Sequence, residues 1–209
     1  LPQQLSPPEA PDVVLQTVKW LLTLPDPPAY MSSDAGYHVK RALPSQAWEA
    51  NPTIPKNITA SVIVAGKDYA PGETRPQLAF RVTEIELIRN ATPFLGELVG
   101  AVLMTFLREA FTHLIWTYMD CLSVIQVISR GWATKSTAPE HRAYGLLVQA
   151  ILRLKTSSQP QIEWTEAHPE KKRLPTPTKP GRPPIPRSKW TLQNHLNVLA
   201  DLYSAPTLP

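Results

Sequence analysis

The distribution of proline is the feature that most restricts how this chain can fold. Proline accounts for 24 of the 209 residues, more than twice the usual ~5%. Inside a helix or a central strand it removes a backbone hydrogen bond. The prolines concentrate in residues 1–27, 38–57 and 174–186. We therefore expect most of the regular elements of the fold outside these three segments, apart from a short helix in the first.

The composition indicates a globular chain with one hydrophobic core. Hydrophobic residues make up 43% and charged residues 18% of the sequence, and this length suffices for one domain with extensions. The longest apolar run, residues 98–107, is shorter than the ~20 residues of a membrane helix, and the first residues do not resemble a signal peptide. A single cysteine, Cys121, cannot form an internal disulfide. We expect an intracellular protein, nuclear or cytoplasmic, with no membrane partner and with Asn57 and Asn90 unglycosylated.

The apolar pattern predicts strands in the first half of the chain and alternating helices and strands in the second. A run of β-branched residues at 59–65 predicts a strand that ends at Gly66. Thr92 and Pro93 are typical of a helix start. The other expected elements are a strand at 29–33, one or two strands in 77–88, a buried strand at 114–119, helices between Asp120 and Gly131 and from Pro139, a strand at 161–165 and a helix at 191–203. This order predicts an α/β fold with an antiparallel meander followed by parallel strands.

The positive charge of the chain is concentrated in one segment. Residues 171–190 hold seven basic residues, six prolines and no acid. Since the net charge is +4, the remaining 189 residues carry −3. We expect an extended, polyproline-like excursion. It is either a solubilising loop or an arm for nucleic-acid phosphates, with Lys171, Lys172 and Arg173 as candidate contacts.

Several acidic and amide residues lie where ligands gather in α/β proteins, at strand and helix ends. Asp120 follows a strand that is otherwise apolar, and ligands bind beyond such carboxyl ends; capping the next helix would also explain it. Glu97 lies in the first turns of the long helix, where the helix dipole favours an acid. Asn194, Asn197 and Asp201 share a polar helix face, which solvent exposure alone would explain.

Four blocks of sequence, taken in order, resemble the ribonuclease H family. Residues 94–102 are similar to the family's glutamate-bearing helix, and residues 117–125 to its strand, aspartate and helix. Trp164 to His168 is similar to its tryptophan–histidine motif, and residues 197–201 to its closing Asn-x-x-Ala-Asp. His168-Pro169-Glu170 and Trp190-Thr191 are most similar to ribonuclease H domains of retrotransposon reverse transcriptases. The resemblance implies a ribonuclease H-like fold with a mixed five-stranded sheet flanked by helices.

The resemblance covers residues 28–205 and suggests a division of the chain. Residues 1–27 are expected to be a proline-rich linker with a short helix at 13–24, following an upstream polymerase region of the same polyprotein. The domain would carry an insertion at 38–57 and the basic proline-rich loop at 171–190. Residues 206–209 would form a tail.

The resemblance also implies an activity: endonucleolytic hydrolysis of the RNA strand of RNA·DNA hybrids, leaving a 3′-hydroxyl and a 5′-phosphate. Two Mg²⁺ ions, or Mn²⁺, would be held by four carboxylates, because clustered carboxylates repel one another unless cations neutralise them. Asp34 would bridge both ions, Glu97 and Asp120 would hold the ion on the substrate side, and Asp201 the ion that activates water. His168 would assist proton transfer or product release.

Some of these assignments leave alternatives. Strand order favours Asp34 as the first carboxylate, with Asp68, in an expected turn beyond Gly66, as the rival. Ser123 and Asn197 are candidates for polar contacts in the minor groove of the hybrid.

Three other functions compete with an active ribonuclease H. A catalytically inactive module that binds or scaffolds nucleic acid would not need all four acids. An integrase or resolvase on the same fold would leave the block Trp164 to His168 unexplained. A proline-rich interaction protein would carry these acids as ordinary surface charge.

Overall fold

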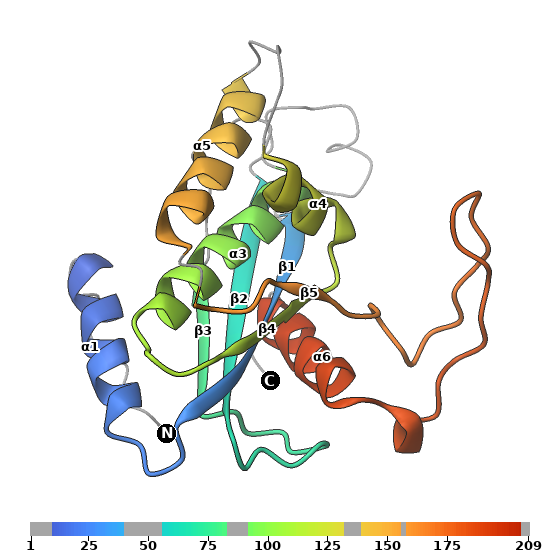
Figure 1. The fold of residues 1–209 in the computed structure, drawn as a ribbon. Coiled ribbons are helices and arrows are strands. Elements are labelled where there is room, and N and C mark those ends of the chain that lie inside the picture. Colours follow the sequence, from blue (N-terminus) through green and yellow to red (C-terminus); the bar gives the residue numbers. More distant parts are fainter. Residues whose placement is uncertain (1–9, 40–55, 83–91, 132–138, 156–157, 206–209) are drawn as a thin grey trace.

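A five-stranded mixed sheet lies at the centre of the molecule (Figure 1). The structure, a computed structural model, describes residues 10–39, 56–82, 92–131, 139–155 and 158–205. The strands are β1 (Pro28–Val39), β2 (Lys56–Gly66), β3 (Leu78–Val82), β4 (Trp116–Met119) and β5 (Glu163–Trp164), in the order β3-β2-β1-β4-β5. The first three strands pair antiparallel, whereas β1–β4 and β4–β5 are parallel. The predicted mixed sheet of a meander plus parallel strands is confirmed.

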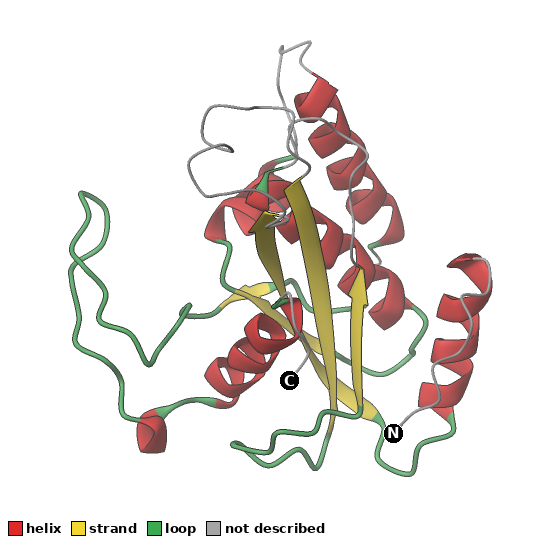
Figure 2. Ribbon diagram, turned by 180° about the vertical axis from the view of Figure 1, so that it is seen from behind, coloured by secondary structure: helices red, strands yellow, loops and turns green. Residues whose placement is uncertain are grey.

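Helices cover both faces of this sheet, as the two opposite views in Figures 1 and 2 show. The helices are α1 (Ala10–Leu22), α3 (Pro93–Glu109), α4 (Leu122–Arg130), α5 (Pro139–Leu154) and α6 (Leu192–Ser204), with a short 3₁₀ turn, η1 (Arg187–Lys189). Alternate residues of β2 divide the core between the faces. Val62 and Val64 pack into the larger cluster with α3, α4 and α5. Ile63 and Ala65 pack into the smaller cluster with α6.

Helix α3 lies unusually close to β1, and this closeness positions the site. Its start is capped as predicted, because Thr92 Oγ1 accepts a hydrogen bond from the Leu95 N–H at 3.3 Å. At Gly96 a Cβ atom would lie 2.5 Å from Ile58 Cγ2 and 2.8 Å from Ala35 Cβ. Only glycine therefore lets the helix approach the strand this closely.

Gly96→Ala is expected to lower the melting temperature by about 2–8 °C. The added methyl group overpacks the contact between α3 and β1, and the resulting cost exceeds the ~1 kcal/mol by which alanine favours a helix. Differential scanning calorimetry measures the shift. Gly100→Ala is the matched control: its Cβ would meet Ser33 at 3.0 Å, so a smaller change is expected. Equal stability of Gly96→Ala and the wild type would contradict this account of the packing.

Three expectations about the irregular segments need correction. Strand β1 continues beyond the expected 29–33 to Val39, where it pairs with Lys56; the ends of the expected insertion at 38–57 are therefore strand, and the rest lies outside the described residues. The helix expected inside a linker packs on the domain, because Val18 and Leu21 are buried in the larger cluster. The basic segment is not simply extended but folds back as a hairpin, with antiparallel bridges Arg173–Arg182 and Thr176–Lys179.

Two further sequence expectations lie outside the described residues: a second strand after β3, in residues 83–88, and the tail at 206–209. Within the part of the chain that is described, none of the helices has the length and apolarity needed to cross a membrane.

Candidate active site

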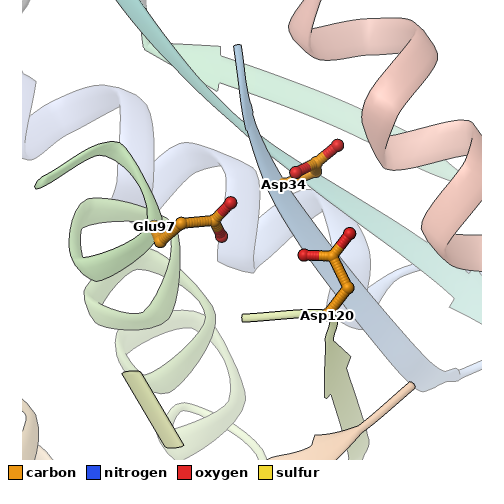
Figure 3. A group of neighbouring side chains, drawn as sticks. All are labelled: Asp34, Glu97 and Asp120. Carbon is orange, nitrogen blue, oxygen red and sulfur yellow. The ribbon is translucent and has the colours of Figure 1, made fainter. Parts of the chain in front are cut away.

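Three carboxylates meet where the central parallel strands approach α3 (Figure 3). Asp34 comes from β1, Asp120 directly follows β4, and Glu97 reaches across from α3. One oxygen atom of each lies within 4.8 Å of the others. The register explains the meeting of the two aspartates, because Ser33 and Met119, the residues preceding them, pair across the parallel strands.

Burial and mutual repulsion disfavour the charged forms of this cluster. Burial raises the pKa of Asp34 to about 10, with further contributions from the charges of Asp120, Glu97 and Asp201. Burial, followed by the charge of Asp120, raises the pKa of Glu97 to about 8. The pKa of Asp120 is also raised by burial, although a hydrogen bond from Asn197 opposes the shift. Without a cation the cluster therefore retains protons at neutral pH.

The donor set fits a divalent cation of the Mg²⁺ type. Carboxylate oxygens are the ligands that such hard cations prefer. Glu97 Oε2 is buried and has no hydrogen-bond partner among the described residues, which would be costly unless another ligand satisfied it. Asp34 Oδ1 accepts a hydrogen bond from the Ala35 N–H at 2.8 Å, which fixes its orientation. Asp34, Glu97 and Asp120 are thus the residues that could hold a metal ion.

Asp120 is held in place by two residues from distant parts of the chain. Asn197 Nδ2 donates to Asp120 Oδ2 at 3.1 Å, and the Trp164 indole N–H donates to the Asp120 carbonyl oxygen at 3.0 Å. The N-cap of α4 is Cys121, and no side chain caps that helix. The capping explanation for Asp120 is therefore wrong, and its carboxylate belongs to the cluster.

Asp201 lies beside the three carboxylates and not within their group. Its side chain is 46% exposed, and its Oδ2 lies 3.6 Å from His168 Nδ1. Its charge still contributes to the raised pKa of Asp34, so it remains close to the cluster. Of the four acids expected to converge, the structure brings three together and leaves the fourth at the edge.

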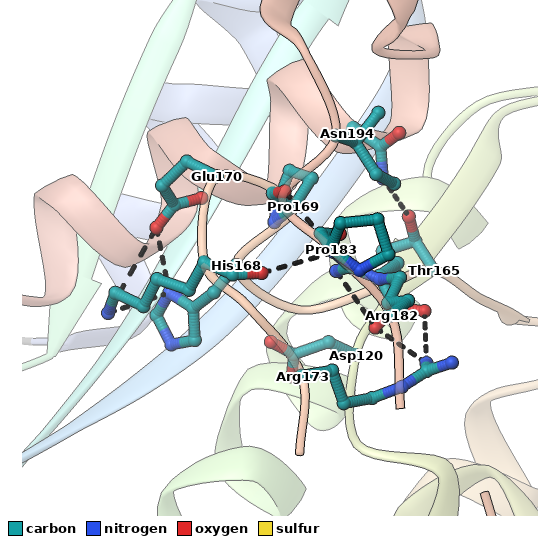
Figure 4. Close-up of polar contacts among 12 residues, drawn as sticks. Asp120, Thr165, His168, Pro169, Glu170, Arg173, Arg182, Pro183 and Asn194 are labelled. Carbon is teal, nitrogen blue, oxygen red and sulfur yellow. Dashed lines mark hydrogen bonds and ion pairs between the residues drawn. The ribbon is translucent and has the colours of Figure 1, made fainter. Parts of the chain in front are cut away.

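His168 lies at the edge of the site, next to Asp201, and Figure 4 shows it beside Glu170. Its backbone adopts a left-handed conformation with φ of 45°, which is uncommon for a residue other than glycine. Its Nδ1 lies 3.4 Å from Glu170 Oε1 as well as 3.6 Å from Asp201 Oδ2. Lys171 Nζ lies 3.4 Å from the same nitrogen, so two acidic side chains and one basic side chain surround this edge of the imidazole ring.

The rival first carboxylate, Asp68, lies away from the cluster. It is in the turn after β2, where its N–H donates to the Asp26 carboxylate at 3.3 Å. Gly66, at the end of β2, pairs with Pro28 at the start of β1, whereas Asp34 lies six residues further along that strand. The two acids are thus separated along the sheet.

The residues predicted to bind substrate occupy different environments. Ser123, Lys171 and Lys172 are exposed. Asn197 is only 1% exposed and binds Asp120, so its position suits orientation of that carboxylate and not contact with a duplex. Arg173 Nη1 donates to Glu166 Oε1 and Oε2 at 2.9 and 2.8 Å, so its guanidinium is already engaged within the protein.

Two supporting residues were not singled out from the sequence. Glu166 binds two arginines, Arg173 and Arg182; its place just before a wholly basic segment is the signal that could have identified it. Ser61 Oγ donates to the Ala200 carbonyl oxygen at 2.6 Å and ties β2 to α6. No sequence signal distinguishes this serine from others in strands.

No family model matches the chain, and no curated protein matches it. Among solved structures, RNase H1 from the halophilic archaeon Halobacterium salinarum is similar with a TM-score of 0.41 and 14% identity, over 66% of this chain and 84% of that one. The N-terminal RNase H domain of a Mycobacterium tuberculosis protein has a TM-score of 0.40 and 15% identity, over 66% and 83%. The PFV RNase H domain has a TM-score of 0.49 and 14% identity, over 83% and 90%. These TM-scores lie below 0.5. The assignment of the fold is therefore based on the strand order and the connections of the chain itself.

Proposed function

We propose that this protein is a metal-dependent ribonuclease H that hydrolyses the RNA strand of RNA·DNA hybrids. The observation that carries the proposal is the convergence of Asp34, Glu97 and Asp120 beside a mixed sheet of order β3-β2-β1-β4-β5. The four sequence blocks that resemble the ribonuclease H family support it, since each of them contributes a residue to this site or its edge. A scaffold protein would have no need to bury three mutually repelling acids.

The residues that would hold the metal are Asp34, Glu97 and Asp120, with Asp201 beside them for a second ion. Mg²⁺ or Mn²⁺ at such a site lowers the pKa of bound water and stabilises the charge that develops on the phosphate. Asn197 keeps the Asp120 carboxylate turned toward Asp34 and Glu97. His168, whose Nδ1 lies 3.4 Å from Glu170 Oε1 and 3.6 Å from Asp201 Oδ2, would move a proton during product release.

The finer assignments follow from the resemblance. The chain would belong to a retrotransposon reverse transcriptase, acting in the nucleus or cytoplasm next to the polymerase region of the same polyprotein. Residues 28–205 would form the ribonuclease H domain, although α1 packs on it. Exposed Ser123 and the lysines Lys171 and Lys172 would contact the hybrid.

The test of the proposal is the substrate specificity of cleavage. The protein is incubated with Mg²⁺ and an RNA·DNA hybrid labelled separately on each strand, and in parallel with single-stranded RNA, duplex RNA and duplex DNA. We expect cleavage of the RNA strand of the hybrid alone, with 3′-hydroxyl and 5′-phosphate ends. Hybrid binding without cleavage would favour the inactive module, and cleavage of duplex DNA would favour an integrase-like nuclease.

His168→Ala is expected to lower kcat by about 10²-fold with little change in KM, because a group that transfers a proton acts on the chemical or release step and not on binding. Steady-state kinetics on the hybrid measures both constants. A raised KM with normal kcat would instead assign His168 to substrate binding.

A further inference from the structure

A proline-rich hairpin leaves the candidate active site at His168 and returns at the start of α6 (Figure 1). We call residues 169–190 the arm. Arg173 and Arg182 exchange backbone hydrogen bonds of 2.9 Å in both directions, and the Thr176 N–H donates to the Lys179 carbonyl at 2.8 Å. The Ile185 N–H donates to the Pro169 carbonyl at 2.8 Å and closes the base. The arm therefore has a defined conformation.

Glu166 fastens the arm to the body of the protein by binding Arg173 and Arg182, the two arginines labelled in Figure 4. Its carboxylate accepts two hydrogen bonds from Arg173 Nη1 and lies 3.1 Å from Arg182 Nη2. The three side chains are only 15–26% exposed. Arg182 Nη1 also donates to the Lys171 carbonyl at 3.1 Å. Two of the seven basic residues of the arm, Arg173 and Arg182, thus stabilise its conformation.

The arm also docks on a residue that supports the carboxylates. Lys179 Nζ lies 4.6 Å from the centre of the Trp164 ring, a cation–π contact. The Trp164 indole N–H donates to the Asp120 carbonyl oxygen. His168, at the base of the arm, lies 3.6 Å from Asp201. The arm is therefore attached at the edge of the site.

The remaining cations of the arm are exposed: Lys171, Lys172, Arg187 and Lys189. Lys171 Nζ lies 4.0 Å from Glu170 Oε1, and Arg187 lies over the Trp190 ring. No acid lies in residues 171–190. Exposed like charges on a stiff, proline-rich segment repel one another, and a polyanion with regularly spaced phosphates would relieve that repulsion. Because the conformation is already fixed, little ordering entropy would oppose binding.

We propose that the arm is a preformed clamp that binds the phosphate backbone of the RNA·DNA hybrid through Lys172, Arg187 and Lys189, and that Glu166 is the positioning residue that holds the clamp at the site. This inference rests on the proposed function, because it identifies how the same substrate is held. A duplex whose phosphate lies at the carboxylates is within reach of the base of the arm, beside His168.

The first test compares the wild type with a triple variant, Lys172→Gln, Arg187→Gln and Lys189→Gln. Fluorescence anisotropy measures binding of a labelled hybrid in EDTA, which prevents metal-dependent cleavage, across a range of salt concentrations. We expect binding about 10–100-fold weaker near 0.1 M salt, and a slope of log K against log salt concentration that is smaller by about 2–3, roughly 1 for each lost phosphate contact.

A control triple variant removes the same amount of charge elsewhere. Lys19, Arg142 and Arg153, exposed on α1 and α5, are each changed to Gln. Its slope should equal that of the wild type. If the arm variant keeps the wild-type slope while the wild type binds and cleaves the hybrid, the clamp is refuted and the proposed function stands.

Two other outcomes separate the proposals. Arm-dependent hybrid binding without any cleavage in Mg²⁺ would support the clamp and overturn the proposed hydrolysis. A wild-type protein that binds no hybrid at any salt concentration would overturn both.

The positioning role of Glu166 has its own test. Glu166→Gln should raise KM for the hybrid about 10-fold with kcat changed less than about 3-fold, because the arm loses its anchor while the carboxylates stay in place. Hydrogen exchange of the Arg173 and Arg182 amides should accelerate in this variant. A lower kcat with unchanged KM would contradict the role.

Discussion

Asp120→Asn is expected to reduce cleavage of the RNA·DNA hybrid by about 10³-fold or more while the protein stays folded. The substitution removes one negative charge from the group that would hold the metal, and metal-ion stabilisation of a phosphoryl transition state contributes several kcal/mol. The amide oxygen can still accept the hydrogen bond that Asn197 Nδ2 now gives to Asp120 Oδ2. Loss of activity with an unchanged melting temperature or a higher one would therefore report on charge and not on folding.

Asp68→Asn is the matched control for this prediction. Asp68 is exposed in the turn after β2 and does not belong to the carboxylate group, so the variant should retain activity within about twofold. Asp34→Asn should behave as Asp120→Asn does. If Asp68→Asn were inactive and Asp34→Asn active, the assignment of the first carboxylate would be reversed.

We expect the free energy of unfolding of the metal-free protein to fall as the pH rises. Unfolded carboxyl groups titrate near pH 4, whereas burial raises the pKa of Asp34 to about 10 and that of Glu97 to about 8. Between these values the folded state binds more protons than the unfolded state, so raising the pH lowers the free energy of unfolding. The melting temperature in EDTA should drop by about 5 °C or more between pH 6 and pH 9.

Added Mg²⁺ should reverse this trend, because the cation replaces the protons that the cluster otherwise retains. We expect the gain in melting temperature to be larger at pH 8 than at pH 6. Thermal denaturation with EDTA and with Mg²⁺ at each pH measures both effects. Asp34→Asn should flatten the pH dependence and abolish the gain, whereas Asp68→Asn should change neither. If the wild type, Asp34→Asn and Asp68→Asn gave the same melting temperatures at every pH, with EDTA and with Mg²⁺, the carboxylate cluster would not be the origin of the pH dependence.

The elements predicted correctly are those whose signals are local. The start of α3 depends on Thr92 and Pro93, and the start of α6 on Thr191, which with Asn194 forms a capping box. The second half of β1 has only a weak signal, because Asp34, Ala35 and Gly36 at its start are residue types that are depleted in strands. These residues become strand through pairing with β2, which a local pattern does not reveal.

The site was predictable to the extent that its residues follow strand ends and helix starts. Asp34, Glu97 and Asp120 meet as the resemblance implied. The burial of Asn197 was not predictable, because a polar helix face is typical of solvent exposure, whereas this face of α6 lies over Asp120. The ion pairs of Glu166 depend on the hairpin, which brings together residues 7 and 16 positions apart.

The proposed function depends on a divalent-cation site formed by Asp34, Glu97 and Asp120. Anomalous X-ray diffraction from crystals grown with Mn²⁺ tests it most directly, since manganese scatters anomalously and prefers the same oxygen ligands. We expect an anomalous peak within bonding distance of an oxygen from each of the three carboxylates, and no such peak in crystals of Asp34→Asn. A wild-type crystal with no peak among these residues, from protein that still cleaves the hybrid, would contradict it.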